Sequence, residues 1–162
     1  EVFDIQNNDF HGGCSRYFIG KKDKREITQN VIAHRKMEDL FGLKKIESYK
    51  KFVENIKISK KKLNELILKI LKDGKKIVGY GAPAKSTTIL NYCGLGANVI
   101  DKIYDNSSTK INKYTPGESL INIKNSEYFK NETSEYCILF AWNHKDEIIN
   151  KEKQFSKNGG RE

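Results

Sequence analysis

Residues 79–86 read GYGAPAKS and decide the expected fold, because they fit the pattern G-x-G-x-x-G/A. An apolar run precedes them and a helix-forming run follows, which is the setting of the phosphate-binding turn in doubly wound α/β folds. In such a turn Gly79 permits the tight bend, Gly81 lets the backbone approach a bound group, and Ala84 allows a helix to pack closely on a strand. The stretch therefore predicts the first βα turn of a Rossmann-like sheet.

The same turn predicts an anion site. A helix that starts at Pro83 directs its unpaired N–H groups toward an anion, most naturally a diphosphate, and Lys85 could add a point charge. An acidic residue about 20 positions further on bonds a ribose hydroxyl in such folds, and Asp105 is well placed for this. Tyr80 either stacks on a base or sugar or packs on the adjacent helix. The competing interpretation is a tight βα turn that holds no ligand.

From residue 75 onward, strands and helices alternate. Strands are expected at 76–79, 98–104, 120–123 and 136–141, and helices at 83–92, 126–130 and 144–156. Alternation of this kind indicates a parallel sheet with crossover helices. The predicted fold class is α/β: a Rossmann-like three-layer αβα domain with a mostly parallel sheet.

An N-terminal strand pair and a long helix are expected before this core. The strands are predicted at 2–6 and 14–19, and a first helix at 27–41. Apolar residues spaced by three and four over 44–71 predict the long helix, whose stripe is interrupted at Ser59 and Lys60, where a bend or break is allowed. We expect residues 1–72 to lead into a core at 73–162, the two forming one domain cut from a longer protein.

Composition narrows the function classes. A formal charge of +9 favours an anionic partner, such as nucleic acid, a membrane surface or a phosphorylated small molecule. The lysines are spread along the chain, however, which a biased genome composition explains equally well. No run of about 18 apolar residues occurs, so no membrane span is expected. Cys14, Cys93 and Cys137 lie far apart without a CxxC pair, which predicts no metal site and a reducing, cytoplasmic compartment.

Several further motifs occur in a fixed order along the chain. Residues 11–16 read HGGCSR, residues 79–85 read GYGAPAK, and residues 91–94 read NYCG. Asp105 and Lys110 then precede a Pro-Gly pair at 116–117, AWN at 141–143 precedes Glu-Ile at 147–148, and a glycine pair stands at 159–160. Together these motifs resemble the C-terminal domain of sugar C-methyltransferases, the S-adenosylmethionine-dependent enzymes of branched deoxysugar biosynthesis. The ordered combination is far more specific than any one motif.

The chain departs from the family pattern at three positions. Cys14 stands where the family usually has Ser, and Ser15 stands where an apolar residue precedes the Arg. Residues 120–122 read LIN where an isoleucine–proline pair is usual. These departures concern the fine choice of substrate rather than membership of the family.

The resemblance implies that this domain holds the nucleotide of a keto-deoxysugar substrate, while zinc and S-adenosylmethionine bind to N-terminal parts of the enzyme. The family's candidate general base is a His in a Tyr-x-Glu-His segment, which this sequence lacks, as it lacks the zinc cysteines. We therefore expect a fragment that is inactive alone, with no catalytic residue and no cofactor of its own. The expected partners are a nucleotide-diphosphate sugar and the N-terminal S-adenosylmethionine-binding domain of the same chain, with neither nucleic acid nor a membrane.

Other candidate contacts lie near the start of the chain and after the last expected strand. The turn at 11–13 lets a ligand or another backbone come close, and His11 is a candidate for a supporting role. Arg16 offers forked donors to a phosphate, or forms an ion pair on the strand surface. Trp142 and Asn143 follow a parallel strand at the edge where open α/β sheets bind ligands. The predicted substrate-binding set is His11, Gly12, Gly13, Arg16, Tyr80, Gly81, Ala82, Pro83, Ala84, Lys85, Asp105, Lys110, Trp142 and Asn143.

Two other functions compete with this one. The glycine turn serves NAD(P) equally well, so a dinucleotide-dependent oxidoreductase is the first rival, although little chain is left for a separate substrate domain. A basic nucleic-acid-binding module is the second rival. It predicts steep salt dependence, and the sequence carries no recognised nucleic-acid motif.

Overall fold

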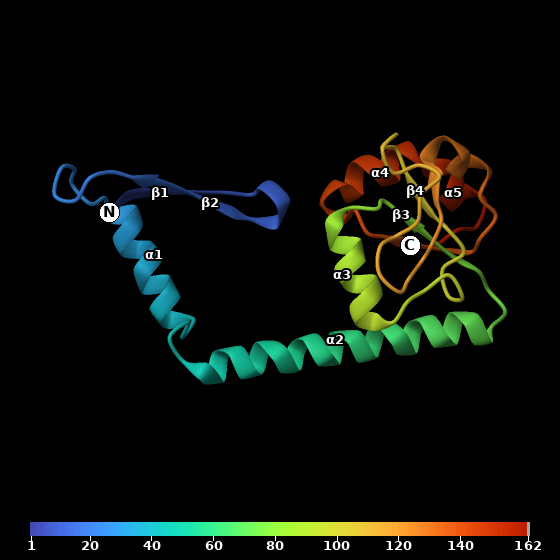
Figure 1. Ribbon diagram of the computed structural model, residues 1–162, viewed down its shortest axis with the longest axis horizontal. Coiled ribbons are helices and arrows are strands. Elements are labelled where there is room, and N and C mark those ends of the chain that lie inside the picture. The colour runs from blue at the N-terminus through green and yellow to red at the C-terminus, as the bar shows by residue number, and fades with distance from the viewer. Residues whose placement is uncertain (162) are drawn as a thin grey trace. The chain divides into compact units, whose positions relative to one another are not determined.

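A computed structural model describes residues 1–161 of the chain, with only the backbone described for His11. The chain forms two compact units, Glu1–Ser59 and Lys60–Glu162 (Figure 1). The second unit contains the parallel sheet, and the first contains an antiparallel strand pair.

The sheet of the second unit has four strands in the order β5-β4-β3-β6, and every neighbouring pair is parallel. Its strands are β3 (Ile77–Tyr80), β4 (Ile103–Asp105), β5 (Ile123–Asn125) and β6 (Tyr136–Leu139). All four residues of β3 are buried, as expected for a strand covered on both faces. The predicted α/β fold with a parallel sheet is confirmed.

One face of the sheet is covered by α3 (Ala84–Cys93) and by the C-terminal part of α2 (Ile46–Lys72). Ile67 and Ile70 from α2 meet Leu90 from α3 in a buried apolar cluster with residues of the strands. Apolar positions three residues apart lie on one side of a helix, so this stripe of α2 is the side that packs on the core.

The opposite face is covered by η2 (Ser126–Asn131), α4 (Lys145–Lys151) and α5 (Lys153–Lys157). Phe129 and Phe155 lie at the centre of this second cluster, with ring centroids 4.9 Å apart. The sheet thus lies between two helical layers, which are seen on either side of β3 and β4 in Figure 1.

The first unit is built on an antiparallel pair with a helix against it. Its elements are β1 (Val2–Asn8), the 3-10 turn η1 (Phe10–Gly12), β2 (Cys14–Ile19) and α1 (Gln29–Leu40). Ile5 of β1 and Val31 of α1 are the buried apolar residues of this unit, with exposed fractions of 6% and 2%. The predicted N-terminal strand pair is confirmed.

Helix α2 is continuous from Ile46 to Lys72, so the break that the sequence allows at Ser59 and Lys60 does not occur. The Ser59 hydroxyl donates to the carbonyl of Asn55 at 2.9 Å, so this polar residue is accommodated within the helix. Among residues 1–161, no helix is long and apolar enough to cross a membrane.

Two expected elements differ from the structure. The strand expected at 98–104 is only Ile103–Asp105, because the carbonyl of Gly96 accepts the amides of Val99 and Ile100 and closes a turn there. The strand expected at 120–123 is instead Ile123–Asn125, since Leu120 has a φ of 44°, outside the range of extended backbone.

The helix expected at 144–156 is divided. It consists of η3 (Trp142–His144), α4 and α5, with the break at Glu152. The Glu152 carboxylate accepts the Tyr80 hydroxyl at 2.7 Å, and the next turn directs Phe155 into the core. The sequence pattern of this segment is that of one helix, but contacts of Glu152 and Phe155 with the core divide it into two.

Glu132 is a buried carboxylate that joins β4 to the segment before β6. It accepts the Tyr104 hydroxyl at 2.5 Å, the amides of Thr133 and Ser134, and the Ser134 hydroxyl. Burial alone raises the pKa of Glu132, but these hydrogen bonds outweigh burial and bring the pKa down to about 2. The folded chain therefore stabilises the ionised form of Glu132 relative to the unfolded chain.

Replacement of Glu132 by Gln is expected to remove an acid-sensitive part of the stability. The pKa of Glu132 falls from 4.5 to about 2 on folding, so its stabilisation is complete above pH 4.5 and is lost as the pH falls toward 2. At pH 6 this is worth roughly 3 kcal/mol of unfolding free energy. Urea unfolding from pH 2 to 6 should show E132Q less stable at pH 6, with the difference closing near pH 2. E127Q, at an exposed site, is the control, and an unchanged pH slope in E132Q contradicts the assignment.

Candidate functional site at the carboxyl edge of the sheet

A cavity of about 340 Å³ lies beyond the carboxyl ends of the strands. Its lining comes from the end of β3 and its loop, from the segment after β4, and from the segment after β6 including α4. Because β4 and β6 lie on opposite sides of β3, the chain leaves this edge in two directions, which is where open α/β sheets form ligand crevices. The lining residues are Tyr80, Gly81, Pro83, Asp105, Asn106, Ser107, Lys110, Ala141, His144, Glu147, Ile148 and Lys151.

Gly81 brings two of the cavity's loops into contact. It has a φ of +83°, and a Cβ there would lie 2.6 Å from the Cβ of Ala141. The expected reason for Gly81 was close approach to a ligand, whereas the structure shows close approach to the loop after β6. Gly79 has a similar role inside the strand, since a Cβ there would lie 2.8 Å from both Ile103 and Phe140. The tight bend expected at Gly79 is not there, because Gly79 lies within β3.

Two amides of the glycine turn already have acceptors. The Gly81 amide donates to the carbonyl of Tyr104, and the Ala82 amide donates to Asp105 Oδ2, both at 2.7 Å. The other carboxylate oxygen of Asp105 accepts the Ser107 amide at 2.8 Å. The buried Asp105 thus ties the loop after β3 to the loop after β4, with Lys110 Nζ 3.6 Å from Oδ2.

The start of α3 is the remaining group of donors in this turn. Pro83 is extended and immediately precedes the helix, rather than being its first residue, and no side chain caps the helix. The Ser86 amide and hydroxyl both bond to the Pro83 carbonyl, at 2.9 and 2.7 Å. The amides of Ala84 and Lys85 therefore stand at an uncapped helix start, which favours an anion.

Lys85, Trp142 and Asn143 form a group beside the cavity. Lys85 Nζ donates to Asn143 Oδ1 and lies 4.8 Å from the centroid of the Trp142 ring. Trp142 is 51% exposed, and the side-chain amide nitrogen of Asn143 is buried with no partner in the described part of the chain. The GAPAK and AWN segments, which are far apart in the sequence, thus meet at one place.

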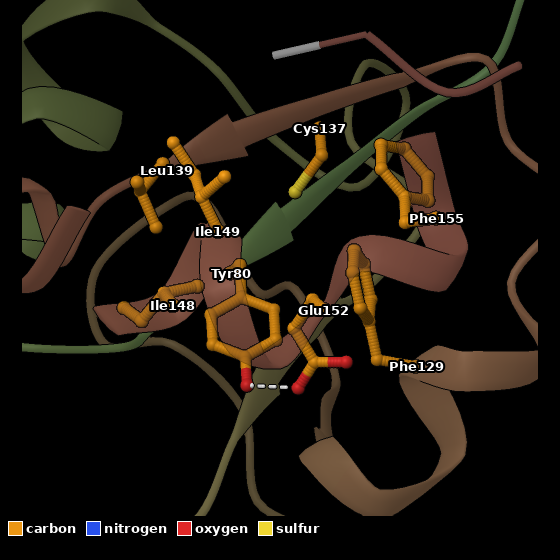
Figure 2. Close-up of a pocket in the computed structure, with 8 residues that line it drawn as sticks. All are labelled: Tyr80, Phe129, Cys137, Leu139, Ile148, Ile149, Glu152 and Phe155. Atoms are coloured by element: carbon orange, nitrogen blue, oxygen red, sulfur yellow. Dashed lines mark hydrogen bonds between the residues drawn. The ribbon is translucent and has the colours of Figure 1, made fainter. Parts of the chain in front are cut away.

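Tyr80 forms the floor of the cavity. The residue is 7% exposed, and its ring packs edge-on against Phe129, with ring centroids 4.9 Å apart. Figure 2 shows its hydroxyl directed at Glu152, beside a small pocket of about 20 Å³ lined mainly by apolar side chains. Burial first, and then the hydrogen bond to Glu152, raise the pKa of Tyr80. The ring is packed against Phe129, and Tyr80 also lines the cavity. Its stacking on a base or sugar stays a prediction.

The remaining predicted contacts belong to the other unit. Gly12 and Gly13 have φ values of 86° and 110°, and Arg16 is exposed on β2. The side chain of His11 lies outside the described residues. The cavity itself is formed wholly by residues of Lys60–Glu162.

Sequence reasoning missed the contribution of α4 and of His144, the residue just before it. His144, Glu147, Ile148 and Lys151 line the cavity, with His144 Nδ1 3.7 Å from Glu147 Oε2. Their spacing of three, four and seven residues is that of one helix face. This spacing after the AWN segment is the signal that could have identified them.

Asn91 explains why the N-Y-C-G and Pro-Gly segments occur together. Its side-chain amide donates to the Pro116 carbonyl at 3.1 Å, and its Oδ1 accepts the Glu118 amide at 3.0 Å. Gly117, with a φ of +88°, lies directly against this side chain, where a Cβ would clash. These motif residues therefore shape the segment between β4 and β5 rather than line the cavity.

Comparison with known proteins identifies the family of this chain. Residues 9–162 match the family described as the C-methyltransferase C-terminal domain. The chain belongs to this family. It is also 33% identical over 161 residues to the C-methyltransferase NovU of Streptomyces niveus, an alignment that covers 99% of this chain and 38% of that protein. This C-methyltransferase C-terminal domain thus spans little more than a third of the length of that relative.

Replacement of Gly81 by Ala is expected to destabilise this C-methyltransferase domain by about 1–3 kcal/mol, because it combines a positive φ with a clash against Ala141. Gly94→Ala is the matched control, since Gly94 has a φ of +71° with nothing within 4 Å. Urea unfolding of both variants separates the clash from the backbone strain. Ala141→Gly added to G81A should recover stability, and no recovery would rule out the proposed contact.

Proposed function

We propose that this domain binds the nucleotide diphosphate of a sugar substrate in the cavity at the carboxyl edge of its sheet. The observation that carries the proposal is the position of this cavity, over β3 and next to the uncapped start of α3. Membership of the C-methyltransferase C-terminal domain family supports it, because the substrate of such an enzyme must be held by some part of the chain.

Several residues of the predicted set have suitable places for this role. Pro83 and Lys110 line the cavity, and the amides of Ala84 and Lys85 lie at the helix start. The buried side-chain nitrogen of Asn143, which lacks an acceptor, could donate to a ligand oxygen. We infer that the nucleotide lies along this edge, with its diphosphate at the start of α3.

The domain's task in the reaction is to position the substrate. In the whole enzyme, a base would remove a proton next to the keto group of a deoxysugar, and the resulting enolate would attack the methyl group of S-adenosylmethionine. Binding the remote nucleotide here would anchor the sugar in the donor domain and lower the barrier by orientation. We infer that the base, the zinc and S-adenosylmethionine belong to an N-terminal domain of the same enzyme in the cytoplasm, with which this domain cooperates.

Trp142 offers a direct test, because it is the only tryptophan in the chain and directly follows Ala141, which lines the cavity. Thymidine or guanosine diphosphate should change its fluorescence saturably, whereas NAD should not. A diphosphate present at 100 times its dissociation constant should raise the melting temperature by roughly 5–10 °C, since such binding adds about 2.7 kcal/mol. A response to NAD and to neither diphosphate would favour the oxidoreductase instead.

A second expectation concerns activity. The chain alone, mixed with S-adenosylmethionine and a nucleotide-linked keto-deoxysugar, is expected to form no methylated product, because the donor site and the base are assigned to another domain. Mass spectrometry of the nucleotide sugar after long incubation is the measurement. Turnover by this chain alone would show that the donor site lies within these residues.

A further inference from the structure

Two lysines line the cavity from the two sides of β3. Lys110 follows β4, and Lys151 lies in the last turn of α4, after β6. Because β4 and β6 are the two neighbours of β3, Lys110 reaches the cavity from the loop after one neighbour and Lys151 from the helix after the other. Lys85 is not among the lining residues, since its ammonium is bound to Asn143 and lies over Trp142.

Both lining lysines are held loosely. Lys110 Nζ lies 3.6 Å from Asp105 Oδ2, and Lys151 Nζ lies 3.4 Å from both the Tyr80 hydroxyl and Glu152 Oε1. Close charge-assisted hydrogen bonds are about 2.7–2.9 Å long, and an ammonium has three donors. Each lysine therefore keeps donors for a further acceptor without breaking a tight pair.

The glycine turn has few free backbone amides that could bind the charge of a diphosphate. The amides of Gly81 and Ala82 already bond to Tyr104 and Asp105, which leaves only the first amides of α3 for a phosphate. A diphosphate carries charge on two groups, and one short row of amides faces only one of them. Lys110 and Lys151 supply positive charge in the part of the cavity where the backbone amides of Gly81 and Ala82 are already bonded.

The surroundings of Lys151 set its position. The Tyr80 hydroxyl donates to Glu152 at 2.7 Å, as Figure 2 shows, and its oxygen accepts from Lys151. Burial alone lowers the pKa of Lys151, but Tyr80 and Glu152 outweigh it and the pKa is raised, so the ammonium stays charged at neutral pH. Of the two carboxylates that line the cavity, Asp105 is bonded to two amides, and the exposed Glu147 lies by His144.

We propose that Lys110 and Lys151 clamp the diphosphate of the bound nucleotide from the two sides of β3, with Tyr80 and Glu152 as positioning residues for Lys151. The proposal rests on the function proposed above and assigns its charge recognition to particular side chains. It predicts that the site distinguishes a nucleoside diphosphate from the monophosphate mainly through these two ammonium groups.

Isothermal titration of the full chain with thymidine and guanosine di- and monophosphates tests the clamp. Lys110→Gln and Lys151→Gln should each weaken diphosphate binding by roughly 10- to 100-fold, the effect of losing a hydrogen bond to a charged group. Monophosphate binding should change by much less. Lys151→Arg should retain most of the affinity for the diphosphate. Tyr80→Phe should weaken diphosphate binding only a few fold and should partly reduce the preference for diphosphate over monophosphate.

Lys145→Gln and Lys153→Gln are matched controls, because these lysines are exposed nearby and do not line the cavity. Unchanged thermal melting of each variant shows that the fold is kept. If the unmodified chain binds no diphosphate, the proposed function itself is wrong. If it binds diphosphate and both glutamine variants bind equally well, the proposed function stands and the clamp is wrong.

Discussion

The carboxylate of Asp105 organises the carboxyl edge of the parallel sheet. It lies at the end of β4, is buried, and accepts one amide from the turn after β3 and another from the turn after β4. A buried carboxylate is costly unless its oxygens are satisfied, so the two turns and the carboxylate stabilise one another. The shape of the cavity follows from this arrangement, because both turns contribute to its lining.

Gly79 and Gly81 allow neighbouring parts of the chain to pack closely. Gly79 leaves room for Phe140 and Ile103 inside the sheet, and Gly81 leaves room for Ala141. A pattern usually explained by the approach of a phosphate is here explained by the approach of neighbouring protein atoms. The two explanations are compatible, since the loops must first come together before they can enclose a ligand. In this structure the packing of neighbouring protein atoms accounts for both glycines.

The sequence predicts the order of strands and helices well, but it does not predict the individual side-chain contacts. The apolar runs around Val78 and Cys137 and the turn after β3 were enough to predict a parallel sheet and the edge on which the cavity lies. The local sequence pattern does not show which side chain accepts a hydrogen bond from a backbone amide 23 positions away. The bond from the Ala82 amide to Asp105 could therefore not be predicted. Lys151 was missed because it is one of 30 lysines and arginines, and only its helical spacing from His144 marks it.

Tyr80 lines both the cavity and the small apolar pocket beneath it, which is bounded by Phe129, Leu139 and Phe155 (Figure 2). Densely packed side chains transmit small displacements, so a change of volume in that pocket shifts the phenol ring and the groups bonded to its oxygen. A substitution of Phe129, Leu139 or Phe155 is therefore expected to shift the cavity wall at Tyr80, although none of these three residues lines the cavity itself.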